Sequence, residues 1–425
     1  MSNEHGQQFA KERTKARTRV MAGRLAAVVA GIFLAVVGSH GIQPPVTDTE
    51  VKDIPTVPKP GYLQSYVDPV FGNKVTRITG DPGVPISQVG GVWGEVARHN
   101  YSKDAVWNAD QSLMILKMHH RGPSPIFLDG STYEPLFSKE SPGTEIRWHP
   151  RKPNLMIYVG ANEVGTWNVR IGEKTVIGSF PGYSNFYLGP WEGNVSLDGS
   201  LLAVYAKKGS DAVAFAYDMV NKVKYPDLEL KGVDVDWVSI SALGRYVVLN
   251  GVIEGSDDRT QVYDLQGNRV GALWSDYGRP SHYDLTVDQN GDEVAVGVSK
   301  SAPDDGRVIK RRLRDGTVTV LTDGGYAMHT STRNLKRPGW AYVTYQYRGD
   351  KYPPYRDEVV AVKLDGSGGV ERLAHLHTND TGYSAEAHAC PSPDGRRAIW
   401  ASNWDSPTGK PVGAYVVEVQ RSGGG

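Results

Sequence analysis

A short pattern recurs along most of the chain: a few polar residues, a tight turn, and then a run of β-prone apolar residues. Its clearest copy is Ala389–Ser402, in which Asp394-Gly395 supplies the turn and Arg396–Ala401 reads as a buried strand. The turn position recurs at intervals of 42, 46, 45, 47, 48 and 56 residues, at Gln111, Pro153, Gly199, Gly244, Gly291, Gly339 and Gly395. This is the period of a four-stranded propeller blade, which is about 40–50 residues.

The second half of each repeat contains a further strand, a polar turn and another strand, so each unit supplies four strands. Ala414–Gln420 in the last unit has no strand after it, whereas Asn73–Thr79 has strand character and precedes the first unit. That early segment can complete the last blade and close the ring, which removes exposed sheet edges. A content of 49 Gly and 26 Pro favours turns over helices. We predict an all-β, seven-bladed β-propeller over residues 61–425, closed by this N-terminal strand.

Residues 1–41 read as a targeting segment. Basic side chains up to Arg24 precede the uncharged apolar run Leu25–Val37, which is the pattern of a secretory signal peptide. The run is short for a membrane span, which needs about 20 apolar residues, so an uncleaved N-terminal anchor is the alternative. We therefore predict export, with a secreted or periplasmic location. Residues 42–60 are rich in proline and read as an extended linker.

Composition and missing motifs exclude several classes of function. The formal net charge is +0, so no overall field attracts nucleic acid, and we expect no nucleic-acid partner. The single cysteine, Cys390, excludes an internal disulfide framework. The sequence lacks the Gly-x-Ser-x-Gly elbow of serine hydrolases, the phosphate-binding P-loop and the His-Glu-x-x-His motif of zinc proteases.

In a propeller, the residues just before each inner strand gather around the axis at one face of the ring. The candidates for a metal site at these positions are His282, His329, His388 and Cys390. Imidazole and thiolate are ligands for zinc or another borderline metal, so we expect a divalent ion, with zinc first and calcium or manganese as alternatives. The alternative is a set of polar side chains that bond only to nearby backbone. Asp284 and Glu386 could orient the imidazoles.

A second group of candidates suits an anionic substrate. His119 and His120 lie beside Arg121 where a strand ends, so one imidazole can transfer a proton while cations neutralise a carboxylate. An exposed basic loop is the alternative reading. Tyr183, Tyr187 and Arg279 are expected near this group by their positions in the ring, although most of the 22 tyrosines must be structural.

Residues of about 60 to 420 resemble exported seven-bladed polysaccharide lyases of the ulvan lyase and oligogalacturonate lyase types. The resemblance rests on the Pro391-Ser-Pro-Asp-Gly repeat, the His119-His120 loop, Arg279 with His282, and Glu386-Ala-His388. It implies β-elimination of a uronic-acid polysaccharide, with the substrate carboxylate neutralised, the C5 proton removed and the C4 leaving oxygen protonated.

The resemblance also implies roles for particular residues. His119 or His120 and Arg279 would handle the carboxylate, Tyr183 or Tyr187 and a histidine would exchange protons, and His282, His329 and His388 would bind metal. We therefore favour an enzyme, a polysaccharide lyase with an acidic polysaccharide as its partner. A non-catalytic propeller that binds a glycan or a protein at the cell envelope is the alternative. We expect a monomer that meets the membrane only through an N-terminal anchor.

Overall fold

The computed structural model describes residues 44–253, 256–275, 277–349, 353–379 and 381–419. The predicted signal peptide or anchor, residues 1–41, lies outside these residues and belongs to a separate unit of the chain. Among the described residues, no helix combines the length and the apolar character needed to cross a membrane. The description below concerns the unit that starts at residue 43.

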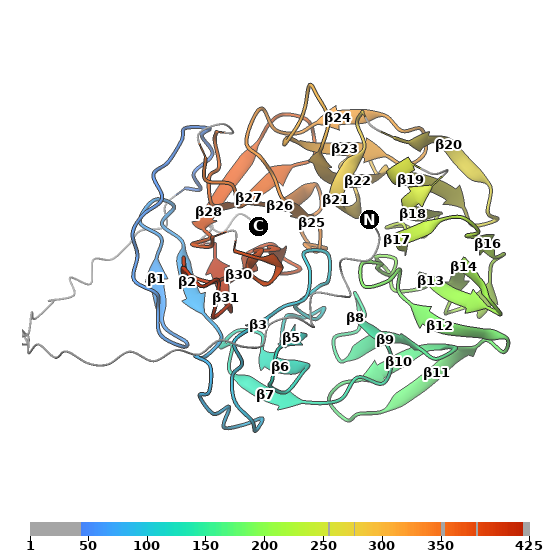
Figure 1. Cartoon of the computed structure of the whole chain (residues 1–425), viewed down its shortest axis with the longest axis horizontal. Helices are drawn as coiled ribbons and strands as arrows, with labels where there is room; N and C mark the ends of the chain where they lie inside the picture. Colours follow the sequence, from blue (N-terminus) through green and yellow to red (C-terminus); the bar gives the residue numbers. More distant parts are fainter. Residues whose placement is uncertain (1–43, 254–255, 276, 350–352, 380, 420–425) are drawn as a thin grey trace, which may run out of the picture. The chain divides into compact units, whose positions relative to one another are not determined.

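The described residues form seven antiparallel blades, arranged as a ring around a central axis (Figure 1). Blade 1 contains β4 (Leu113–Leu116), β6 (Ile126–Asp129) and β7 (Pro135–Ser138), and the bridge between Trp107 and Met114 takes the place of its inner strand. The short strands β3 (Ala97–Arg98) and β5 (Met118–His119) pair next to it.

Blades 2 to 4 follow in chain order. Blade 2 contains β8 (Glu145–Trp148), β9 (Leu155–Gly160), β10 (Glu163–Asn168) and β11 (Lys174–Ser179). Blade 3 contains β12 (Tyr183–Tyr187), β13 (Leu201–Lys208), β14 (Asp211–Asp218), β15 (Val223–Lys224) and β16 (Leu228–Glu229). Blade 4 contains β17 (Asp234–Ile240), β18 (Tyr246–Ile253), β19 (Ser256–Asp264) and β20 (Arg269–Trp274).

Blades 5 to 7 complete the ring. Blade 5 contains β21 (Pro280–Val287), β22 (Glu293–Ser299), β23 (Val308–Arg312) and β24 (Val318–Val320). Blade 6 contains β25 (His329–Ser331), β26 (Trp340–Tyr345), β27 (Glu358–Lys363) and β28 (Val370–His375). A 3-10 helix, η2 (Tyr383–Ala385), precedes blade 7, which contains β29 (Cys390–Pro391), β30 (Arg397–Ser402), β31 (Gly413–Glu418), β2 (Lys74–Arg77) and β1 (Ser65–Val67).

The repeated sequence pattern is the turn between the first two strands of a blade. In blade 7 the Asp394 carboxylate accepts the Arg396 N–H at 3.0 Å, and Gly395 adopts a φ of 65°. A left-handed φ of this kind is easily reached only by glycine. The apolar run after the turn is β30, whose residues from Ala398 to Ser402 are buried. The predicted all-β propeller is therefore confirmed, together with the role of its repeat.

The N-terminal strand closes the ring as predicted. β2 pairs antiparallel with β31, with Lys74 opposite Glu418 and Val75 opposite Val417. The Glu418 carboxylate also accepts the hydroxyl proton of Tyr133 from blade 1 at 2.9 Å. β1 adds a fifth strand outside β2, so blade 7 combines the two ends of the described chain.

The segment predicted as a linker, residues 42–60, is extended where it is described, and side chains of the propeller hold it. Val46 forms a bridge with Arg372 of β28, and the Arg372 guanidinium donates to the Glu50 carbonyl at 2.6 Å. Further along, the Trp404 indole donates to the Val57 carbonyl at 3.0 Å. This segment therefore runs along blades 6 and 7 before the chain enters β1.

A buried carboxylate fixes the closing hairpin to blade 6. Asp68, between β1 and β2, accepts the backbone N–H and the ring Nδ1–H of His375, both at 3.0 Å, and the N–H of Val70 at 2.9 Å. Burial raises the pKa of the Asp68 carboxyl, but the His375 ring and the N–H donors outweigh it and hold the pKa below its ordinary value of 3.8. The ionised form of Asp68 is therefore the one that stabilises the closed ring.

We predict that Asp68→Asn lowers the free energy of unfolding by about 3 kcal/mol at neutral pH, because an amide has one accepting oxygen and its NH2 group would face the N–H donors of either His375 or Val70. The contribution of Asp68 is complete above pH 3.8, its ordinary value, and is lost as the pH falls through the lower folded pKa. Urea unfolding across this range checks it: the wild type should lose stability in acid more steeply than the variant. Asp53→Asn, an exposed control, should behave like the wild type, and equal acid dependence of all three proteins would contradict the prediction.

Candidate functional site

Three of the predicted metal-binding residues meet where the inner strands of blades 5, 6 and 7 begin. The ring centroids of His282 and His329 lie 4.5 Å apart, and those of His329 and His388 lie 4.0 Å apart. His329 and His388 are only 1% and 0% exposed. Histidine is only occasionally buried this fully, and clusters of buried titratable side chains are common at functional sites. This cluster is therefore the first candidate for a functional site.

The backbone is locally irregular at two of these histidines. His282 has a φ of 46° and His388 a φ of 47°, in the left-handed region that side chains other than glycine rarely adopt. At His282 the register of β21 against β22 also shifts between Ser281 and Asp284. A bulge re-aims a side chain that the strand alternation would direct elsewhere. The backbone is therefore strained at the two residues that direct these imidazoles into the cluster.

Glu386 completes the cluster with a carboxylate. Its Oε2 lies 3.2 Å from His388 Nε2 and 3.6 Å from His329 Nε2, and its side chain is 22% exposed. The contact to His388 is short, yet the buried Nε2 has no hydrogen-bond partner among the described residues. The ligand atoms of His329, Glu386 and His388 all lie within 4.8 Å of one another. Two imidazoles and a carboxylate whose ligand atoms converge in this way can share a single cation.

The imidazoles of His329 and His388 are neutral at physiological pH, because burial lowers the pKa of each well below its ordinary value. Burial, followed by the nearby His282 and Arg98, lowers the pKa of His329 well below its ordinary value. Burial and the charge of Arg98 likewise lower the pKa of His99 to about 3. A neutral imidazole is the form that can bind a metal ion or accept a proton.

Arg98 was not a sequence candidate, yet it organises the segment that carries Glu386 and His388. This fully buried guanidinium donates to the carbonyls of Glu386 at 2.7 Å and Ser384 at 2.9 Å, and also to His388 Nδ1. Because a guanidinium can only donate, Nδ1 of His388 must accept, and the neutral ring then carries its proton on Nε2. Arg98 lies in the two-residue strand β3 and belongs to no recognisable motif, so the sequence alone did not indicate its role.

Aromatic and cationic groups from blade 1 adjoin the histidines. The Tyr101 ring lies 4.7 Å from that of His388 and 5.3 Å from that of His329. Lys103, which is 3% exposed, bonds to Glu192 at 2.8 Å and places its ammonium 3.7 Å from the Trp237 ring centroid. The candidate site therefore continues from blades 5–7 across to blades 1, 3 and 4.

Cys390, predicted as a fourth ligand, lies in an apolar cluster between blades 7 and 1 with Trp107, Met114 and Ile399. Its Sγ is 3.6 Å from the Asp104 carbonyl oxygen and 3.8 Å from Ser331 Oγ. Burial raises the pKa of this thiol to about 12. The group of three potential ligands found in the described part of the chain does not include it.

The predicted catalytic residues are spread over several places. His119 accepts the Gly94 N–H at Nε2 and donates from Nδ1 to the Pro123 carbonyl, both at 2.8 Å, so both nitrogens are used by the backbone. His120 follows β5. Burial lowers its pKa, and so do the positive charges of Lys410 and Arg98. Arg279 is 9% exposed and directly precedes β21.

The two predicted tyrosines belong to the edge of blade 3. The Tyr183 hydroxyl donates to Asp227, at 2.8 Å to Oδ2. Tyr187 packs edge-on against Trp191, with ring centroids 5.7 Å apart, and against Tyr205 at 6.3 Å. Asp284, expected beside the imidazoles, instead pairs with Arg333 at 2.9 Å. The aromatic groups nearest the histidines are Tyr101 and Tyr383.

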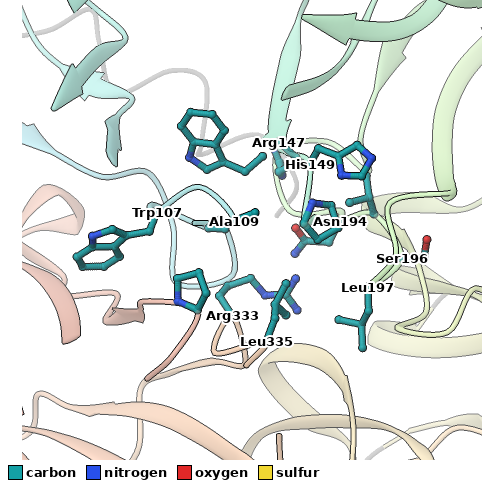
Figure 2. Close-up of a pocket in the computed structure, with 14 residues that line it drawn as sticks. Trp107, Ala109, Arg147, His149, Asn194, Ser196, Leu197, Arg333 and Leu335 are labelled. Carbon is teal, nitrogen blue, oxygen red and sulfur yellow. The ribbon is translucent and has the colours of Figure 1, made fainter. Parts of the chain in front are cut away.

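A narrow cavity lies at the other end of the inner strands, where they lead into the blade turns. Figure 2 shows Trp107, Arg147, His149, Asn194 and Arg333 around it, and its volume is about 30 Å³. A space of this size holds one or two water molecules. A wider cavity of about 540 Å³ adjoins it at the same end and is bordered by Asp110, Arg151 and Lys336.

The sequence matches no protein-family model and no curated protein. Two solved structures share the fold. An oligogalacturonate lyase in complex with manganese aligns with a TM-score of 0.58 and 12% identity, over 84% of this chain and 96% of the other. An oligogalacturonate lyase from Vibrio parahaemolyticus aligns with a TM-score of 0.56 and 11% identity, over the same shares of the two chains. This chain therefore has the seven-bladed propeller fold of oligogalacturonate lyases, as the sequence resemblance predicted.

Proposed function

We propose that the protein is an exported polysaccharide lyase that cleaves a uronic-acid-containing polysaccharide by β-elimination. The observation that carries the proposal is the convergence of His282, His329 and His388 with Glu386 where the inner strands of blades 5, 6 and 7 begin. The shared fold with oligogalacturonate lyases supports it. Export rests on the basic and apolar leader of residues 1–41, and the substrate would be met outside the cell or in the periplasm.

The same cluster is suited to a divalent metal ion. His329, Glu386 and His388 would hold it, since two imidazoles and a carboxylate suit manganese or zinc alike. Manganese is the ion named with one of the oligogalacturonate lyases. When bound, the ion would neutralise the substrate carboxylate and so make the C5 proton more acidic.

The chain's own residues can supply the proton transfers. His282 stands next to the ligand group without belonging to it, so its imidazole is placed to accept the proton from C5. The electron pair of that C–H bond forms the C4–C5 double bond as the C4–O bond breaks. Burial and the charge of Glu192 raise the pKa of Tyr101 well above its ordinary value, so its phenol stays protonated and can donate to the leaving oxygen.

Cations around the cluster would hold the anionic chain in place. The guanidinium of Arg98 is buried beside the cluster, and the ammonium of Lys103 borders it in a pair with Glu192. His120 would contribute hydrogen bonds and not charge, because its pKa is lowered below the ordinary value. The tyrosines first expected to exchange protons, Tyr183 and Tyr187, lie on blade 3, so Tyr101 takes that role in the proposal. We retain the expectation of a monomer that binds an acidic polysaccharide.

We predict that Glu386→Gln and His329→Ala each reduce metal affinity at least tenfold, because each removes one donor from a three-donor site. Metal analysis of purified protein, followed by titration of the stripped protein with Mn²⁺ and Zn²⁺, measures the effect. His149→Ala is the matched control, since this buried histidine lies at the other end of the axis. Wild-type metal content in both site variants would remove the metal from the proposal.

We predict that His282→Ala lowers kcat about 10²-fold or more, because the C5 proton then lacks its acceptor. The assay follows the absorbance of unsaturated uronates released from pectate, oligogalacturonates, glucuronan and ulvan. Tyr183→Phe is the control, because its hydroxyl bonds to Asp227 and not to the histidines, and it should keep its activity. A folded wild-type protein that releases no product from any of these glycans would favour the non-catalytic propeller instead.

A further inference from the structure

We propose that Trp191, supported by Tyr187, is an aromatic platform that binds a pyranose ring of the substrate next to the histidine cluster. The inference deepens the proposed function and rests on it, because it names a subsite for the same acidic glycan. It starts from an exposed side chain: Trp191 is 56% exposed, although tryptophan is among the most apolar residues. Tyr187 contacts it edge-on, with the ring centroids 5.7 Å apart.

The backbone of Trp191 is held in a strained conformation. Its φ is 70°, in the left-handed region that is sterically unfavourable for a bulky residue. The neighbouring Gly193 allows the chain to pass close by, since a Cβ there would lie 2.5 Å from the Val238 carbonyl oxygen. The loop is thus shaped so that it projects one large apolar side chain into solvent.

A buried ion pair from blade 2 clamps this loop from both sides. Glu145 accepts the Trp191 N–H at 2.9 Å, and Arg147 donates to the Trp191 carbonyl at 2.8 Å. The two side chains also pair with each other at 2.9 Å and are 3% and 4% exposed. A residue keeps a strained backbone conformation only where its neighbours hold it in place, and such residues are frequent at active sites and ligand-binding positions. Burying charged side chains costs free energy. Because Glu145 and Arg147 are buried and hold the backbone of Trp191, we infer that the position of the exposed indole matters for function.

Trp191 lies at the same end of the axis as the histidines. It precedes the inner position of blade 3, as Lys103 does in blade 1 and His388 in blade 7. The next residue, Glu192, bonds to Lys103 at 2.8 Å, and the Lys103 ammonium is 5.9 Å from the Tyr101 ring centroid. Tyr101 in turn contacts His329 and His388. A glycan that reacts at the histidines would therefore extend over Lys103 toward Trp191.

A sugar ring fits this arrangement better than a protein partner does. The C–H bonds on one face of a pyranose ring form a small apolar surface that packs on an indole, while its hydroxyls and carboxylate remain at the rim. A stable protein interface buries about 800 Å² on each partner, with several apolar anchors, which one indole and one phenol ring do not provide.

The test measures binding without turnover, in the His282→Ala background, by calorimetry with trigalacturonate and with ulvan oligosaccharides as probes. We expect Trp191→Ala to raise the Kd about tenfold or more, and Trp191→Phe to retain most of the affinity because a flat aromatic face remains. Ile171→Ala is the control, because it removes another exposed apolar side chain, 69% exposed, from the β10–β11 turn. It should leave the Kd unchanged.

The outcomes separate this inference from the proposed reaction. Equal affinity of Trp191→Ala and its parent for every probe that binds, with unchanged circular dichroism spectra, would overturn the platform. So would a parent protein that binds none of the probes. Binding that depends on Trp191 in a protein whose wild type releases no unsaturated product would support the platform and overturn only the lyase.

Discussion

The closure of the ring by β2 is the constraint on which the rest of the structure depends. Each blade buries its apolar faces against its two neighbours, so a ring with a missing outer strand would expose a sheet edge and an apolar face together. The β2–β31 ladder prevents this, and the Asp68–His375 contacts hold the closing hairpin against blade 6. Closure joins residues that are more than three hundred positions apart in the sequence, as Asp68 and His375 are.

Closure also determines where chemistry can occur. Seven inner strands that start at one face bring their first residues together, whatever the distances between them along the chain. The histidines of blades 5, 6 and 7 meet Arg98 and Tyr101 of the first blade only because blade 7 lies next to blade 1. The cavities between the blade turns lie at the other end of the axis, away from the histidines. The fold thus gathers the histidines at one end, and the loops that lead into the inner strands supply the chemistry.

The fold could be predicted because each repeat carries its own turn and strand signals, such as Asp394-Gly395 before β30. The site could be predicted only in part, because strand alternation fails where function strains the backbone. His388 and Cys390 are two positions apart, and a regular strand would point both side chains the same way. The left-handed φ of His388 breaks this alternation, so its ring faces the axis while Cys390 enters the apolar cluster. Arg98 carries no local signal, since its importance comes from partners on another blade.

Arg98 makes His388 chemically different from His329. A metal-binding histidine commonly donates the proton of its second nitrogen to a carboxylate or a carbonyl group, which strengthens the ring as a ligand. At His388 the second nitrogen accepts from a guanidinium instead, so the ring is a poorer electron donor and Nε2 carries the proton when no ion is bound. An ion would bind Nε2 of a neutral His388 only if the ring moved its proton to Nδ1 and turned that nitrogen away from Arg98, so its affinity would depend mainly on His329 and Glu386. The same guanidinium donates to the carbonyls of Ser384 and Glu386. Arg98 therefore weakens His388 as a ligand and at the same time fixes the backbone that carries Glu386.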